Sequence, residues 1–132
     1  MVTNYKRGYA LEHKTKKILE EKGWFVVRSP ASKTPTDIYA TKNGENLFVQ
    51  CKKTTKDKTY ITGLKEIIKQ AREYKATPLI AYSFQRTPVY AQEITDDKIS
   101  LDKKAKNTTL KKYLEIKEIE QNKDYDNSMI IT

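Results

Sequence analysis

Two stretches of the chain place apolar residues at helical spacing. Near the start, apolar or small side chains fall at positions i, i+4, i+7 and i+8, which share one face of a helix. That stretch is followed by Gly23, a natural C-terminal stop, and it predicts a helix over residues 5–22. A second stripe predicts a helix that ends near residue 75. The first stripe consists of Leu11, Thr15, Ile18 and Leu19, and the second of Ile61, Leu64, Ile67, Ile68 and Ala71.

Between these stretches, short runs rich in β-branched and aromatic residues favour β-strands. Two of them flank Asn43-Gly44, the strongest hairpin signal in the chain. A further run is apolar enough to form a buried strand. The predicted strands cover residues 24–28 (WFVVR), 37–41 (DIYAT), 45–53 (ENLFVQCKK) and 79–84 (LIAYSF), with a further short one at 89–92.

The resulting order, α-β-β-β-α-β, predicts a mixed α/β fold with a hairpin in its middle. The remaining segments are expected to be a loop at 29–36, a polar connection at 54–59, a loop at 93–108 and a tail over the last eight residues. Residues 110–120 can form a helix or an alternating strand, because their apolar residues fit neither period cleanly. A chain of 132 residues has room for one domain, so we assign 1–92 to its core and 93–132 to a C-terminal extension.

The charge is unevenly divided along the chain. Lys and Arg number 26 against 17 Asp and Glu, a net charge of +9. Residues 1–92 hold 18 basic and 8 acidic side chains, and residues 93–132 hold 8 and 9. The first two-thirds of the chain is therefore the candidate surface for a polyanion such as nucleic acid.

Composition excludes several classes of protein and site. A single cysteine, Cys51, excludes an internal disulfide and a cysteine-rich zinc module, and the lone His13 excludes histidine triads. No apolar run approaches the roughly 20 residues of a membrane span. No apolar signal segment opens the sequence, so we expect a cytoplasmic protein. Any catalysis must therefore use carboxylates, amides, hydroxyls and lysines.

The third predicted strand carries the candidate chemistry. Side chains alternate between the two faces of a strand, so Gln50 and Lys52 share one face, which we expect to be open. Cys51 and its apolar neighbours share the other face, which we expect to pack on the core. Asp37 lies across the hairpin. A carboxylate, an amide oxygen and a lysine so placed can hold a hard divalent cation beside a scissile phosphate. Glu12, about 20° from Leu19 on a helical wheel, can lean over the sheet toward Asp37.

These residues resemble the PD-(D/E)XK nuclease superfamily and, within it, the archaeal-type Holliday junction resolvases. The resemblance implies a restriction-endonuclease-like core. It also implies a metal-dependent endonuclease that cuts four-way DNA junctions with paired nicks. The matching stretches follow the family's order over about 70 residues. They are RGYALE (7–12), KGWFVVRSPAS (22–32), TDIYATKNG (36–44), FVQCKK (48–53) and YITGLKEIIKQAREY (60–74).

By this resemblance, Mg²⁺ (or Mn²⁺ in its place) is held by Glu12, Asp37, Gln50 and the carbonyl of Cys51. Lys52 is the catalytic lysine, and Ser32 lies near the scissile phosphate. Resolution needs two symmetric nicks, so we expect a homodimer, with the run at 79–84 and the C-terminal element as candidate surfaces. Side chains expected to contact DNA are Lys6, Arg7, Lys14, Arg28, Lys33, Lys53, Lys56 and Tyr60.

Two departures from the family motif leave alternative functions open. The acidic residue that usually precedes X-K is Gln50 here, which removes a negative charge from the metal site. The proline stands two positions before Asp37, not directly before it. One alternative is a restriction-like or repair nuclease acting on duplex, flap or single-stranded DNA. Another is a DNA-binding protein whose catalytic site has decayed. A resolvase of this composition suits an archaeon or an archaeal virus, in whose host cell it would act.

Overall fold

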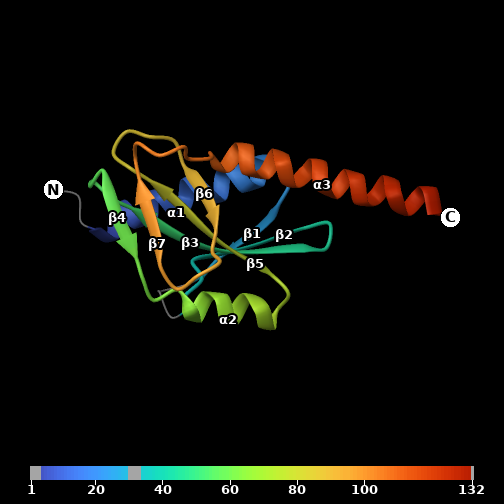
Figure 1. The fold of residues 1–132 in the computed structure, drawn as a ribbon, viewed down its shortest axis with the longest axis horizontal. Helices are drawn as coiled ribbons and strands as arrows, with labels where there is room; N and C mark the ends of the chain where they lie inside the picture. Colours follow the sequence, from blue (N-terminus) through green and yellow to red (C-terminus); the bar gives the residue numbers. More distant parts are fainter. Residues whose placement is uncertain (1–3, 30–33, 132) are drawn as a thin grey trace.

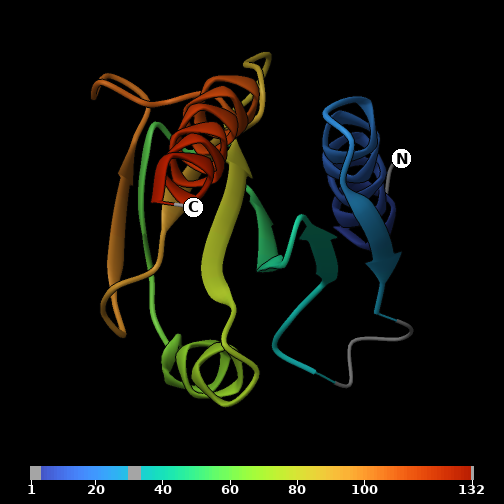
Figure 2. The same ribbon diagram turned by 90° about the vertical axis from the view of Figure 1, so that its right-hand side faces the viewer.

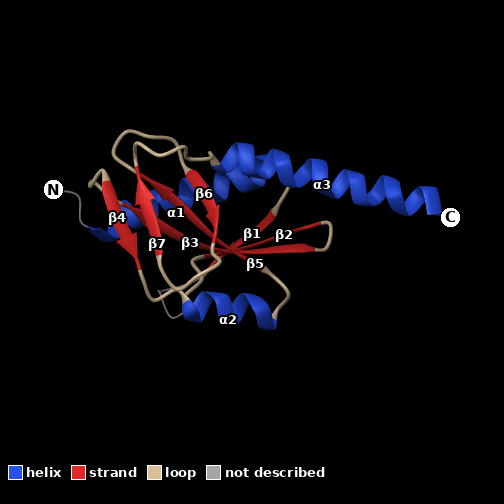
Figure 3. Ribbon diagram, in the orientation of Figure 1, coloured by secondary structure: helices blue, strands red, loops and turns tan. Residues whose placement is uncertain are grey.

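The computed structural model describes residues 4–29 and 34–131, and the side chains of residues 9–29 and 34–122. Figures 1 and 3 show the helices and strands along this part of the chain. The helices are α1 (Asn4–Glu21), α2 (Lys65–Glu73) and α3 (Leu110–Ile131). The strands are β1 (Phe25–Arg28), β2 (Ile38–Lys42), β3 (Glu45–Lys53), β4 (Lys58–Ile61), β5 (Thr77–Ser83), β6 (Tyr90–Glu93) and β7 (Ile99–Asp102).

A five-stranded mixed sheet forms the centre, in the order β1-β2-β3-β5-β6. Strands β1, β2 and β3 are antiparallel neighbours, and β5 runs parallel to β3 and antiparallel to β6. The tight β2–β3 turn is possible because Asn43 and Gly44 both adopt positive φ angles, +50° and +81°. Strand β4 pairs with β7 in a separate two-stranded sheet at the end of the molecule where β3 finishes (Figure 1).

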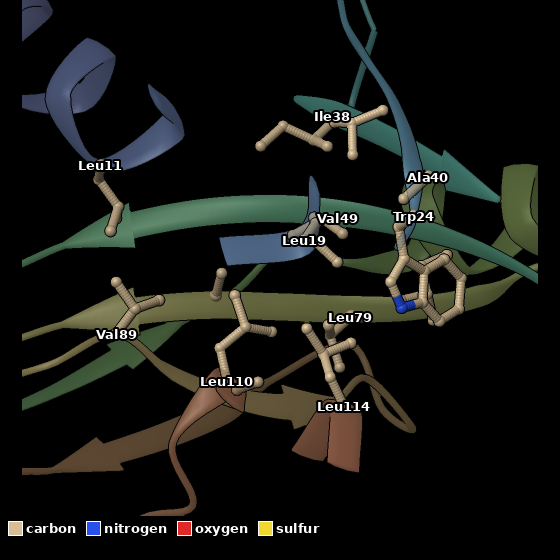
Figure 4. Close-up of a cluster of buried hydrophobic side chains, with 14 residues drawn as sticks. Leu11, Leu19, Trp24, Ile38, Ala40, Val49, Leu79, Val89, Leu110 and Leu114 are labelled. Carbon is tan, nitrogen blue, oxygen red and sulfur yellow. The ribbon is translucent and has the colours of Figure 1, made fainter. Parts of the chain in front are cut away.

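Each face of the central sheet packs against its own layer. On one face, Leu11 and Leu19 of α1 and Leu110 and Leu114 of α3 join the sheet in one apolar cluster (Figure 4). On the other face, α2 and the β4–β7 pair cover the sheet with a second cluster that includes Ile67. In Figure 2, β5 lies between α3 above and α2 below. The predicted fold class is confirmed as a three-layer α/β arrangement.

The hairpin and the early elements are confirmed to within a residue or two, but the region around residue 60 differs. Residues 58–61 form β4, where we expected a polar connection and the start of a helix. Ile61 is buried by pairing with Ile99 of β7, and α2 begins only at Lys65. Ile61 and Leu64 thus belong to the right apolar cluster but not to the helix.

The last third of the chain is more ordered than predicted. Strand β7 replaces part of the expected loop, with Ile99 and Leu101 buried on its inner face. The ambiguous segment is a helix, α3, and its backbone continues to residue 131 in place of the expected tail. Residues beyond 92 therefore contribute to both apolar clusters.

Two sequence-based expectations about surfaces are wrong. The face of β3 that carries Phe48 is not open, because α2 and the β4–β7 pair cover it and leave Phe48 only 8% exposed. The run at 79–84 cannot be a dimer surface, since Leu79 and its neighbours are buried on both faces of the sheet. Within the described part of the chain, no helix has the length and apolar character needed to cross a bilayer.

Candidate active site

The candidate site lies where β2 and β3 separate. Just before β2, the Asp37 N–H donates to the Val49 carbonyl at 2.8 Å, closing the ladder between the two strands. Two residues further along β3, the Cys51 N–H donates to Asp37 Oδ2 at 2.8 Å. From there β3 continues beside β5 as far as Lys53, opposite Ser83. The Asp37 carboxylate thus replaces a backbone acceptor, which fixes its position.

Glu12 reaches this point from α1 and is held by β1. Its Oε2 accepts a 2.7 Å charge-assisted hydrogen bond from Nη2 of Arg28, with both side chains less than a third exposed. The hydrogen bond to Glu12 raises the pKa of Arg28. The guanidinium also lies 4.4 Å from the centre of the Tyr9 ring, in cation–π geometry. Helix α1 and strand β1 are therefore tied together beside Asp37.

The electrostatics of Asp37 reflect this crowding. Burial raises the pKa of its carboxyl; the Cys51 N–H lowers it, the Glu12 charge raises it, and the Arg28 charge lowers it. Burial likewise raises the pKa of the Cys51 thiol, with the Asp37 charge adding to the effect. The thiol therefore stays neutral and packs beside the core, as expected for a small apolar side chain. A cation between Asp37 and Glu12 would offset the repulsion of their charges.

The other half of the site lies on β3. The Oε1 atom of Gln50 is buried and has no hydrogen-bond partner among the described residues. By the alternation of β3, its side chain lies on the α2 side of the sheet, opposite to Cys51. Lys52, two residues on, is exposed. An unpaired buried acceptor is costly, so this oxygen is available to accept from a water or to coordinate a cation.

These donors fit a magnesium ion. The described residues contain no group of three or more His, Cys, Asp and Glu side chains that could hold a metal. Only two carboxylates, Glu12 and Asp37, are at hand, and the remaining donors are the amide oxygen of Gln50 and the carbonyl of Cys51. Such an all-oxygen set, with few carboxylates, suits Mg²⁺, which keeps several of its own waters.

The residues expected to contact DNA are dispersed. Lys14, Lys53 and Lys56 are exposed. Arg28 is half-buried and engaged with Glu12. Tyr60 is 56% exposed on β4, with Nζ of Lys98 4.6 Å from its ring centre. The side chains of Lys6 and Arg7, and all of Ser32 and Lys33, lie outside the described residues.

A hydrogen-bonded circuit behind Asp37 was not anticipated. The hydroxyl of Thr36, a fully buried residue, donates to Gln70 Oε1 on α2 at 2.5 Å. Gln70 Nε2 donates to the Tyr39 hydroxyl at 3.4 Å, and the Tyr39 hydroxyl donates to Thr34 Oγ1 at 3.1 Å. The Thr34 hydroxyl in turn donates to the Thr36 carbonyl at 2.8 Å and closes the circuit. The circuit fixes the residue before Asp37. Its only sequence signal is a lone glutamine in an amphipathic helix, which by itself indicates nothing.

Comparisons with known proteins identify the family of this chain. A family model described as archaeal Holliday junction resolvase (Hjc) matches residues 3–123. The crossover junction endodeoxyribonuclease Hjc of Methanocaldococcus jannaschii is 33% identical over 82 residues, which are 61% of this chain and 61% of that protein.

Two solved structures share the fold. The Holliday junction resolvase Hjc of Archaeoglobus fulgidus superposes with a TM-score of 0.63 at 18% identity, over 73% of this chain and 84% of that one. The bacterial homing endonuclease I-Ssp6803I gives 0.54 at 11% identity, over 76% and 78%. The restriction-endonuclease-like core is thereby confirmed, and with the family model matching most of its length, the chain belongs to the archaeal Holliday junction resolvase family.

Proposed function

We propose that this protein is a Mg²⁺-dependent endonuclease that resolves four-way DNA junctions by paired symmetric nicks. The observation that carries the proposal is the hydrogen bond by which β3 holds the Asp37 carboxylate, donated by the Cys51 N–H at 2.8 Å. The negative charge of Glu12 acts on the same carboxylate. A half-buried carboxylate with a like-charged neighbour is poised for a cation. Membership in the resolvase family supports the junction as substrate.

Each residue of the site has a chemical task. Asp37, Gln50, Glu12 and the Cys51 carbonyl would hold Mg²⁺, whose charge, when bound, stabilises negative charge on the phosphate. Lys52 is exposed and carries three donors, so it can bond the phosphate oxygens and orient the attacking water. Arg28 keeps Glu12 in place through their 2.7 Å bond. We therefore assign Arg28 a positioning role in addition to its expected contact with DNA.

Two nicks need two sites, and an exposed apolar face supports a homodimer. On the edge strand β1, Phe25 is 69% and Val27 is 48% exposed, and Tyr74, just after α2, is 63% exposed. They are linked through less exposed aromatic rings, since Val27 is opposite Tyr39, whose ring centre lies 4.9 Å from that of Phe48, and the Phe48 ring centre lies 6.0 Å from that of Tyr74. A symmetric partner would bury this face, which ends in an unpaired strand edge.

The proposed dimer can be tested by substituting Phe25→Asp together with Val27→Asp. We expect the mass in solution to fall from two chains to one, measured by light scattering, with junction nicking lost in proportion. Ile116→Asp with Ile119→Asp is the matched control, because these α3 residues are also exposed apolar side chains (44% and 56%). If the control variant alone becomes a monomer, the interface is on the C-terminal helix.

The proposed function is tested on a labelled four-way junction beside a linear duplex of the same sequence, with Mg²⁺ and with EDTA. We expect paired symmetric nicks in the junction only, and only with Mg²⁺. Cleavage of both substrates would leave a nuclease without junction selectivity. Salt-sensitive binding without cleavage in Mg²⁺ or Mn²⁺ would mean that the site has decayed.

A further inference from the structure

Folding concentrates lysines at one end of the molecule in a way that the linear charge distribution does not indicate. The connection from β3 to β4 and the turn after β7 meet because β4 and β7 pair, with Lys58 opposite Asp102. Beyond that pair, the Lys103 N–H donates to the Asp57 carbonyl at 2.7 Å. The lysines brought together, here named the lysine ridge, are Lys52, Lys53, Lys56, Lys58, Lys103, Lys104 and Lys106.

The lysine ridge is free to bind a polyanion. All seven of its residues are exposed. The ion pairs formed among the described residues are Lys22–Glu115, Arg28–Glu12 and those of Lys117 with Glu45 and Glu93, and they use none of the seven. Over residues 52–58 and 102–106 there are seven lysines and two aspartates, a net charge of +5. One aspartate, Asp102, is occupied locally as an acceptor for the Lys104 N–H.

The turn at 103–106 is anchored to the C-terminal end of β5, beside the end of β3 that carries the candidate site. The Tyr82 hydroxyl, on β5, donates to Asn107 Oδ1 at 2.7 Å. Asn107 Nδ2 in turn donates to the carbonyls of Asp102 (3.0 Å) and Ala105 (3.1 Å), which closes the turn. Tyr82 is the register partner of Lys52 on β3. The three lysines of the turn are therefore held at the end of β3 that carries the candidate catalytic lysine.

We propose that the turn at 103–106 binds the DNA phosphate backbone next to the cleaved position. The proposal rests on the proposed function and assigns a task to the C-terminal third of the chain, whose overall charge of −1 gives no sign of one. Lysines bind phosphates as point charges without reading bases, which suits recognition of a junction by shape. The turn and the 52–58 connection together offer one continuous track for a DNA arm.

The test compares two triple variants of equal charge on an uncut four-way junction in EDTA, over a series of KCl concentrations. In the first, Lys103, Lys104 and Lys106 are changed to alanine; in the control, the exposed Lys17, Lys65 and Lys69 are. Each phosphate contact contributes about 0.9 to the slope of log K against log salt. We expect the slope to fall by about 2 to 3 in the first variant and by less than 1 in the control. Equal slopes in both variants would overturn the proposal.

A variant with unchanged net charge tests the anchoring of the turn separately from the charge of its lysines. Tyr82→Phe removes only the hydroxyl that holds Asn107 and is expected to weaken junction binding several-fold with the net charge unchanged. Unchanged binding would show that the anchored turn is not needed. A wild type that binds through the turn but never cuts junctions would remove the proposed function and leave the turn's role standing.

Discussion

The two halves of the candidate site are held in opposite ways. The acidic half is completed by the protein itself, because Asp37 accepts from the Cys51 N–H and Glu12 accepts from Arg28. The β3 half is left open: Gln50 Oε1 is buried without a partner among the described residues, and Lys52 is exposed. Hydrogen bonds within the protein thus fix the two carboxylates, whereas the Gln50 amide and the Lys52 ammonium are available to groups that arrive with the substrate.

This difference implies different responses to mutation. Residues of the acidic half are positioned before anything binds, so changes there act on metal binding and on the stability of the free protein together. Residues of the β3 half make no such bonds in the free protein, so removing their side chains should have an effect mainly when Mg²⁺ and DNA are present, whereas a charge introduced there should also lower the stability of the free protein.

The largest effect is expected from removing one charge from each half. Asp37→Asn and Lys52→Ala should each lower the single-turnover nicking rate by roughly 100-fold or more, with junction binding nearly unchanged. The matched controls are Asp57→Asn and Lys53→Ala, both exposed residues close in sequence to Lys52. They should keep the wild-type rate at saturating protein. A wild-type rate in either site variant would show that the site is assigned wrongly.

A second prediction concerns the open acceptor. Gln50→Glu restores the commoner motif and places a buried carboxylate where the unpaired amide oxygen lies. In EDTA this variant should unfold at a lower temperature than the wild type, because burying an unpaired charge is costly. Mg²⁺ should then raise its unfolding temperature more than that of the wild type, since a ligand that binds only the folded state stabilises it.

The same variant should nick at an equal or higher rate and reach half its maximal rate at a lower Mg²⁺ concentration, by about tenfold for a stabilisation of about 1.4 kcal/mol. A folded Gln50→Glu variant that is inactive at every Mg²⁺ concentration would mean that Gln50 has a task other than metal binding.

How much of this could be predicted from sequence depends on the range of the interactions. Strand alternation and the Asn43-Gly44 turn place Asp37 across from Gln50 and Lys52, and both signals are local. The Arg28–Glu12 bond joins β1 to α1, and the Thr36–Gln70 bond joins a loop to α2 across 34 residues. Neither has a local pattern, because each exists only once the layers have packed.

Strand β7 shows the same limit. Its four residues, ISLD, alternate in polarity as a strand should, but they are flanked by polar and charged residues and are too short to predict alone. Only pairing with β4, some 40 residues earlier, buries Ile99 and Leu101. The lysines that follow β7 could therefore not be assigned to the active-site end from sequence.

A smaller effect is expected from the circuit that supports the acidic half. Gln70→Ala leaves the buried Thr36 hydroxyl without its acceptor, so the residue before Asp37 loses its tie to α2. The nicking rate should fall by roughly tenfold, with a higher Mg²⁺ requirement. Gln70→Glu keeps the acceptor and should recover part of the rate. Lys69→Ala is the neighbouring control. A loss of stability with normal Mg²⁺ dependence would reduce Gln70 to a packing role.

The smallest predicted effect is on stability, and its sign is opposite to the effect on activity. Burial raises the pKa of Asp37 above its usual value, so the folded protein holds its proton more tightly than the unfolded chain does. The contribution of Asp37 to the stability of the wild type is therefore fully present below the usual pKa near 3.8 and is lost as the pH rises through the raised pKa of the folded state. Asp37→Asn carries no charge to bury and can still accept from the Cys51 N–H. In EDTA at pH 7 it should unfold at a higher temperature than the wild type, and this advantage should disappear below about pH 4. A variant that is less stable at pH 7 would mean that the bond to Cys51 depends on the charge of Asp37 and outweighs its burial.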